Sequence, residues 1–194
     1  MKKILVVLFS LFFFSSVFSA DITTPPDQLK FIKIIEKTKS IKYENDVQSA
    51  VILEKRNKEL KSNIKLKVKN WIGTVKKIKT NKKGYAIVTI AVKTNNNSNR
   101  YSFLYIANEE NDAKLEGLGL KWWYDVLTTS DRLIKPKSKL YNKISRLSND
   151  DTVKFSGAFE LDDEKFLELK HSYNSALIGE PTFIFKFSDI KQIN

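Results

Sequence analysis

Residues 65–92, KLKVKNWIGTVKKIKTNKKGYAIVTIAV, decide the fold of this chain. Apolar and polar residues alternate at the start of this stretch, which predicts a long first strand over 65–78. Gly73 inside that strand predicts a bulge or strong coiling. Residues 80–84 predict a hairpin turn, and residues 85–92 are apolar on both faces. The sequence therefore predicts two paired strands, of which the second is central in its sheet.

Helical patterns come before these strands. Apolar residues from Asp27 to Thr38 have helical spacing, and Asn45 or Asp46 can cap a second helix that runs to about Ser62. The expected apolar face of the second helix consists of Val47, Ala50, Val51, Leu53 and Leu60. Two helices, or one kinked helix, are therefore expected over 21–63.

The pattern after the first two strands contains one further helix between strands. Residues 101–107 predict a third strand, and Ser138 is the expected N-cap of a helix over 139–147. The expected later strands cover 152–161 and 183–190, with a charged hairpin and a short strand between them. This order is typical of an OB-type barrel, whose helix lies between the third and fourth strands.

Four motifs extend this interpretation: Trp71-x-Gly73, Leu140-Tyr141, Val153-x-Phe155-Ser156-Gly157-x-Phe159, and the run from Pro181 to Ile190. Together they resemble a pattern found in uncharacterised exported bacterial proteins with an OB-fold-like domain. The resemblance covers about Trp71 to Ile190 and the helical stretch near Gln48 to Leu60, and it implies a fold but no activity. The predicted fold class is α+β, with an N-terminal helical hairpin over 21–63. A mostly antiparallel, OB-like β-barrel with one intervening helix is expected over 64–194.

The first twenty residues predict a secretory signal peptide. Lys2 and Lys3 precede an apolar run, and small residues follow it, so cleavage is expected after Ser19 or Ala20. Retention of this segment as an uncleaved anchor stays open, and no transmembrane helix is expected after cleavage. The predicted location is periplasmic or secreted.

The composition of the chain excludes some kinds of functional site and leaves several kinds of partner open. The chain has no cysteine, which excludes disulfides, thiol catalysis and thiolate metal sites. The net charge is +12, and such a balance fits nucleic acid, anionic lipid or an acidic polymer as partner. Only four of the 34 basic residues are arginine, and the abundance of Lys, Asn and Ile also follows from A/T-rich codons. The charge alone therefore identifies no partner.

No residue pattern predicts a catalytic, metal or cofactor site. His171 is the single histidine, whereas zinc needs three or four ligands and a catalytic imidazole needs a partner beside it. The carboxylates at Glu109-Glu110, Asp112 and Asp162-Asp163-Glu164 fall in expected turns and lack calcium-loop spacing. Ser156 lacks the glycine pattern of a nucleophile elbow, so a packing role is expected. The chain is accordingly predicted to be no enzyme.

Aromatic residues are the best functional signal in the sequence. Rings on the first three strands beside many lysines can stack on bases, and adjacent tryptophans can form a partner-binding patch. The alternative is that these rings fill the barrel, as expected for Phe155, Phe159, Phe183, Phe185 and Phe187. The predicted ligand or partner surface comprises Trp71, Tyr101, Tyr105, Trp122 and Trp123.

Three functions remain at this point. The leading hypothesis is an exported, non-enzymatic binding or structural module whose ligand and partner are unidentified, with an envelope protein as one candidate partner. A single-stranded nucleic-acid-binding OB module is an alternative, disfavoured because nucleic acid is scarce outside the cytoplasm. An envelope hydrolase with an unrecognised site is the other.

Overall fold

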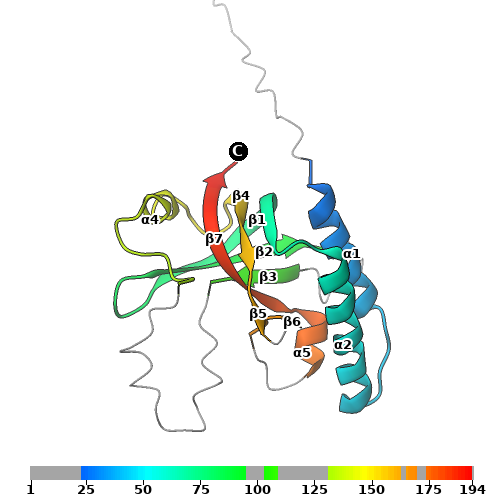
Figure 1. The fold of residues 1–194 in the computed structure, drawn as a ribbon. Coiled ribbons are helices and arrows are strands. Elements are labelled where there is room, and N and C mark those ends of the chain that lie inside the picture. The colour runs from blue at the N-terminus through cyan, green and yellow to red at the C-terminus, as the bar shows by residue number, and fades with distance from the viewer. Residues whose placement is uncertain (1–22, 95–102, 109–130, 163–164, 170–173, 194) are drawn as a thin grey trace, which may run out of the picture.

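The computed structural model describes residues 23–94, 103–108, 131–162, 165–169 and 174–193. The fold is α+β, with helices at both sides of a mixed five-stranded sheet (Figure 1). The elements in chain order are α1 (Pro26–Lys39), α2 (Asp46–Asn63), β1 (Lys67–Thr80), β2 (Ala86–Lys93), β3 (Phe103–Ala107), α4 (Lys139–Ile144), β4 (Thr152–Phe159), β5 (Leu161–Asp162), β6 (Lys165–Phe166), α5 (Asn174–Gly179) and β7 (Thr182–Gln192).

The five longer strands close into a barrel in the order β1-β2-β3-β7-β4. The first strand pairs with β2 through one part of its length and with β4 through the other, so it closes the sheet on itself. All neighbours are antiparallel except β3 and β7, which are parallel. The prediction of mostly antiparallel strands, with the second strand central, is therefore confirmed.

The first strand is long because two irregularities let it bend. The register with β4 shifts between Val68 and Trp71, and the register with β2 shifts between Val75 and Lys77. Gly73 lies between these shifts, and a Cβ there would come within 2.4 Å of the Ile90 side chain. Gly73, predicted to mark a bulge or strong coiling, is thus not itself a bulge but allows close approach of β1 to β2, and the two bulges flank it.

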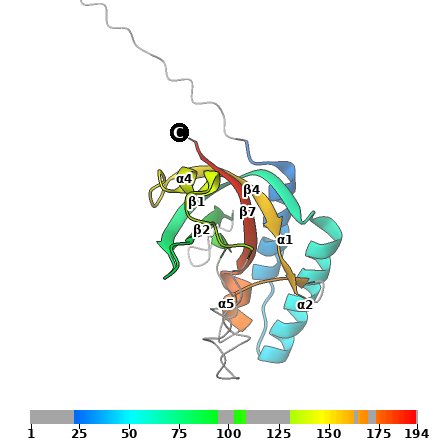
Figure 2. The same cartoon turned by 60° about the vertical axis from the view of Figure 1, so that its left-hand side comes forward.

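One end of the barrel is covered by α1, beside which α2 packs (Figures 1 and 2). The fully buried Phe31 ring of α1 contacts Trp71 and Phe183 of the barrel, with ring centroids 5.2 and 5.1 Å away. The side-chain amide of Gln28 donates to the carbonyl of Ile72 at 2.6 Å and accepts from its N–H at 2.8 Å, as a neighbouring strand would. Helix α1 and the barrel therefore share one hydrophobic core.

The opposite end of the barrel is covered by α4 and by the segment before it (Figure 1). Ser138 caps α4, as predicted, by accepting a hydrogen bond from the Tyr141 N–H at 3.1 Å. Ile144 of this helix is buried in the barrel core. Asn108 is fully buried and binds the backbone of β2 through its amide, donating to Ala86 and accepting from Val88.

The orientation of α2 differs from the prediction. Of the two expected caps, Asn45 rather than Asp46 caps the helix, because its side chain accepts a hydrogen bond from the Gln48 N–H. However, Val47 and Val51 are 74% and 61% exposed, whereas Arg56 is only 2% exposed. The predicted apolar face is wrong at those valines and at Ala50, which is also exposed, because a buried ion pair at Arg56 turns the helix by part of a turn. Leu60 of the predicted face is fully buried, as expected.

The remaining elements agree with the prediction except at their boundaries. The fourth strand ends at Phe159 instead of residue 161, and α4 ends at Ile144 instead of residue 147. The short helix α5 was not predicted. The five phenylalanines of β4 and β7 are all buried, as expected: Phe155, Phe159, Phe183, Phe185 and Phe187. Among the residues described, no helix is both long and apolar enough to cross a membrane.

Candidate ligand-binding face

The outer surface of β3 presents two half-exposed aromatic rings. Leu104 and Ile106 of this strand point into the barrel and are fully buried, so Phe103 and Tyr105 point outward. Tyr105 pairs with Ala91 of β2, whose small side chain leaves the ring uncovered by a larger neighbour on that strand. We call the surface formed by Phe103, Tyr105, Lys39 and Lys76 the β3 face; the two lysines are described next.

Lys39 brings the end of α1 onto this face. Its ammonium donates to the carbonyl of Phe103 at 2.9 Å, at a place where β3 extends beyond its pairing with β7. Burial lowers the pKa of Lys39 to about 8, against the attraction of Glu180 and Glu36, which raises it. A lysine in this environment is charged at neutral pH but loses its proton more readily than a solvated one.

Lys76 reaches the same face from the bulge in β1. The register shift between Val75 and Lys77 leaves Lys76 without a paired residue in β2. Its ammonium lies 5.7 Å from the centroid of the Phe103 ring and donates to Asp150 Oδ1 at 2.8 Å. The β3 face thus combines two rings with two ammonium groups.

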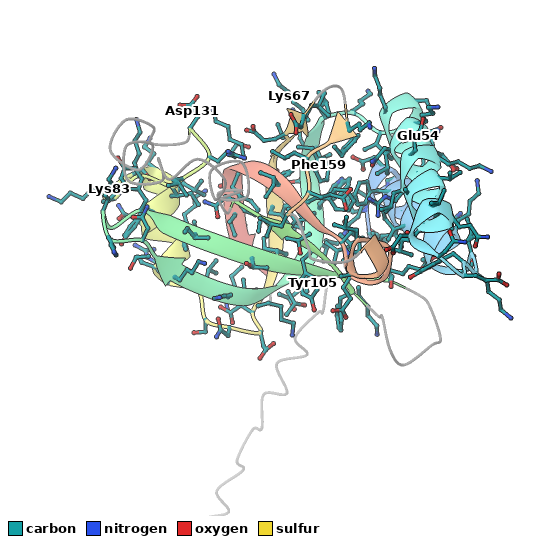
Figure 3. All side chains as sticks on the ribbon, turned by 90° about the horizontal axis from the view of Figure 1, so that it is seen from below. Glu54, Lys67, Lys83, Tyr105, Asp131 and Phe159 are labelled. Carbon is teal, nitrogen blue, oxygen red and sulfur yellow. The ribbon has the colours of Figure 1, made fainter. Side chains whose placement is uncertain are left out.

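The tyrosine hydroxyl on this face stays protonated at neutral pH. Burial raises the pKa of Tyr105, and the nearby Glu180 carboxylate raises it further, while Lys76 lowers it. The Tyr105 backbone N–H donates to the Pro181 carbonyl at 2.9 Å, which brings the residue beside the end of α5 (Figure 3). The face therefore offers hydrogen-bond donors, ring surface and positive charge to a ligand.

The predicted surface residues have different positions. Tyr105 is on the β3 face, but Trp71 is completely buried, so its prediction as a surface residue is wrong. Its indole packs in the core beneath α1 and its Nε1 donates to Asp27 Oδ2 at 2.8 Å, which satisfies the ring without solvent. Tyr101, Trp122 and Trp123 lie outside the described residues.

The residues considered for catalysis form no site in the part of the structure described. Ser156 Oγ accepts a hydrogen bond from the N–H of Asn70, which has a positive φ of 57° in the bulge of β1, so the serine supports the backbone. Within the described residues, no group of three His, Asp or Glu side chains could hold a metal ion. His171, Glu109-Glu110 and Asp112 lie outside the described residues, as do Asp163 and Glu164.

The sequence analysis missed a buried ion pair between α2 and the segment before α5. One nitrogen of the Arg56 guanidinium contacts the Glu168 carboxylate, and another donates to the Leu177 carbonyl at 2.8 Å. The guanidinium also lies 5.6 Å from the centroid of the Phe183 ring. Burial raises the pKa of Glu168, and the Arg56 charge opposes this.

A signal for this pair exists in the sequence. Ser49, Leu53, Arg56 and Leu60 have helical spacing, and the chain keeps an arginine there although lysine prevails elsewhere. Arginine is preferred in buried ion pairs because its planar guanidinium makes several hydrogen bonds at once. The pair connects the helices to the barrel, and it is a structural feature because the side chains of Arg56 and Glu168 are only 1% and 10% exposed.

Comparisons with protein-family models, with curated proteins and with solved structures each find no match to this chain.

Proposed function

We propose that this chain is an exported, non-enzymatic binding module of the periplasm, built on an OB-type barrel. The strand order β1-β2-β3-β7-β4, with a helix between the third and fourth long strands, supports the OB assignment. The resemblance to exported bacterial proteins with OB-fold-like domains is part of the same proposal, and the predicted signal peptide supports export.

The β3 face is the proposed ligand site. Both ends of the barrel are filled by helices, and the barrel interior is packed with phenylalanine and aliphatic side chains, so the ligand must bind outside. Ligands of OB-folds bind on the face formed by strands two and three. The observation that carries the proposal is the pair of half-exposed rings, Phe103 and Tyr105, flanked by the ammonium groups of Lys39 and Lys76.

The chemistry of this face favours an acidic ligand that contains rings. An acidic oligosaccharide of the envelope meets this description, because the C–H faces of sugar rings pack on aromatic rings and their carboxylates attract ammonium groups. Single-stranded nucleic acid has the same combination of ring faces and anions, and the same side chains support it as the second candidate. The predicted export makes the oligosaccharide the first choice.

The test compares two probes on matched variants. Binding of a labelled hyaluronan oligomer and of a labelled oligothymidylate is measured by fluorescence anisotropy at low and physiological salt. Tyr105→Leu removes the ring but keeps an apolar side chain, and Tyr105→Phe keeps the ring. We expect Tyr105→Leu to weaken the binding of the probe by about 1–3 kcal/mol and Tyr105→Phe to have a smaller effect. Equal binding by all three proteins would exclude the β3 face as the site.

A further inference from the structure

Two lysine-rich segments, far apart in the sequence, lie side by side at the barrel end opposite α1 and α2. The hairpin after β1 and the segment before α4 are joined by two backbone hydrogen bonds between Ala86 and Ile134, at 2.9 and 3.3 Å. A Cβ on Gly84 would lie 3.6 Å from Pro136, so the tip of the hairpin contacts this segment. Figure 3 shows Lys83 at this end, beside α4, and Glu54 of α2 at the far end of the molecule.

These two segments carry charge of one sign, although the carboxylates of Asp131, Asp150 and Asp189 lie at the same end of the molecule. Segments 76–85 and 135–147 together contain ten lysines and arginines and no aspartate or glutamate. Of these, Lys76 and Lys143 are paired with carboxylates from elsewhere in the chain. We define the basic cap as Lys82, Lys135, Lys137 and Lys139, which are exposed and have no carboxylate partner among the described residues.

One of these lysines is held in an unfavourable backbone conformation. Lys137 has a φ of 62°, in the left-handed region that glycine and asparagine adopt more easily. A glycine would relieve that strain and remove the charge. A lysine at this position therefore adds an exposed ammonium at the expense of local strain.

We propose that the basic cap docks this protein on an anionic phospholipid surface. Lysine, a compact point charge, suits attraction to a surface of many headgroups better than bidentate recognition of one phosphate. None of the large exposed hydrophobic side chains of the described residues lies in these two segments, so docking is by charge without insertion. The proposal goes beyond the β3 face and does not depend on what that face binds.

The test uses protein recovered after export, with its N-terminus established by mass spectrometry. Vesicles of phosphatidylglycerol mixed with phosphatidylcholine are compared with vesicles of phosphatidylcholine alone by co-sedimentation at low and physiological salt. The cap variant carries Lys82→Gln, Lys135→Gln, Lys137→Gln and Lys139→Gln. The control variant has the same change of net charge at four exposed lysines of the helical end: Lys30→Gln, Lys33→Gln, Lys42→Gln and Lys55→Gln.

The wild type is expected to bind the anionic vesicles, to bind them more weakly as the salt concentration rises, and not to bind the neutral vesicles. Each lysine near an anionic surface increases partitioning by about fivefold, so the cap variant should bind on the order of 10²–10³-fold more weakly. The control variant should bind within about fivefold of the wild type, because its lysines are at the far end. Equal losses in the two variants, or equal binding of the wild type to neutral vesicles, would overturn the proposal.

A second measurement reports the orientation without removing any lysine. Because the chain has no cysteine, Asn142→Cys on α4 and Ser62→Cys on α2 each give a single site for a polarity-sensitive fluorophore. Anionic vesicles should change the emission of the label at residue 142 and leave the label at residue 62 unchanged. The opposite pattern would refute docking through the cap. Tighter cap-dependent binding to an oligothymidylate than to anionic vesicles at the same salt would assign the cap to nucleic acid instead.

Discussion

Replacement of Arg56 by methionine should destabilise the fold more than any other charge removal in the helical segment. The guanidinium is 2% exposed and binds both the Glu168 carboxylate and the Leu177 carbonyl. Removing one partner of a buried ion pair costs about 3–5 kcal/mol, because the other charge stays buried. For a chain of this size that corresponds to a fall in melting temperature of roughly 6–20 °C.

A double-mutant cycle separates the ion pair from packing. The free energy of unfolding is measured by urea titration for Arg56→Met, Glu168→Leu and the double variant. The double variant should be more stable than the sum of the single losses predicts, since no buried charge is left without its partner. Lys58→Met is the control, because Lys58 pairs with Glu54 on the exposed face of the same helix and should cost well under about 1 kcal/mol. If Arg56→Met cost no more than Lys58→Met, or if the single losses were additive, the reasoning would be refuted.

Three further predictions concern packing and titration. Gly157→Ala should cost about 3 kcal/mol or more in thermal melts, because its Cβ would lie 2.2 Å from the Lys186 carbonyl oxygen; an unchanged melting temperature would contradict the close approach of β4 and β7. Phe31→Ala should cost about 3–5 kcal/mol in urea titrations, since the ring packs on Trp71; a loss below about 1 kcal/mol would mean that α1 does not share the core. Burial lowers the pKa of Lys39 to about 8, so the unfolded chain binds more protons than the folded one from pH 8 to about pH 10, and stability should rise with pH over this window. Urea titrations should show a smaller rise for Lys39→Met, and an equal rise would exclude Lys39 as its source.

The barrel could be predicted from the sequence because its signals are local. Alternation in β1, the hairpin turn and the apolar run of β2 are each contained in a few consecutive residues. The N-caps Asn45 and Ser138 could be predicted for the same reason, since an N-cap side chain binds a backbone N–H only three residues further along the chain. The predicted order of elements then limited the fold to few topologies.

The face that α2 buries could not be predicted, because it depends on a residue far away in the sequence. Val47 and Val51 have the spacing of a buried stripe, yet Glu168, which is 112 residues from Arg56, makes the arginine face the buried one. Hydrophobic periodicity identifies a helix, but it does not reveal that a charged side chain is buried because a distant residue neutralises it.

The candidate site was predicted only in part, for a related reason. Tyr105 was identified from its place on an aromatic strand, but alternation does not distinguish the inside of a barrel from the outside, and Trp71 proved to be inside. Lys39 and Lys76 escaped the sequence analysis because one reaches the face from the end of α1 and the other from a bulge. Neither position follows from local spacing.

The two proposed surfaces should act independently of each other, and this can be measured. Tyr105 pairs with Ala91, whereas the basic cap adjoins Ala86, five residues away along β2. That separation is about 16 Å at the rise of a strand, which is twice the screening length of about 8 Å at physiological salt. A barrel docked through its cap would keep α1 and α2 away from the lipid and leave the β3 face open at the side (Figure 1). Affinity for the acidic oligosaccharide should therefore agree within about twofold between vesicle-bound and free protein. A much weaker affinity on vesicles would mean that the lipid covers the β3 face and that the two surfaces form one site.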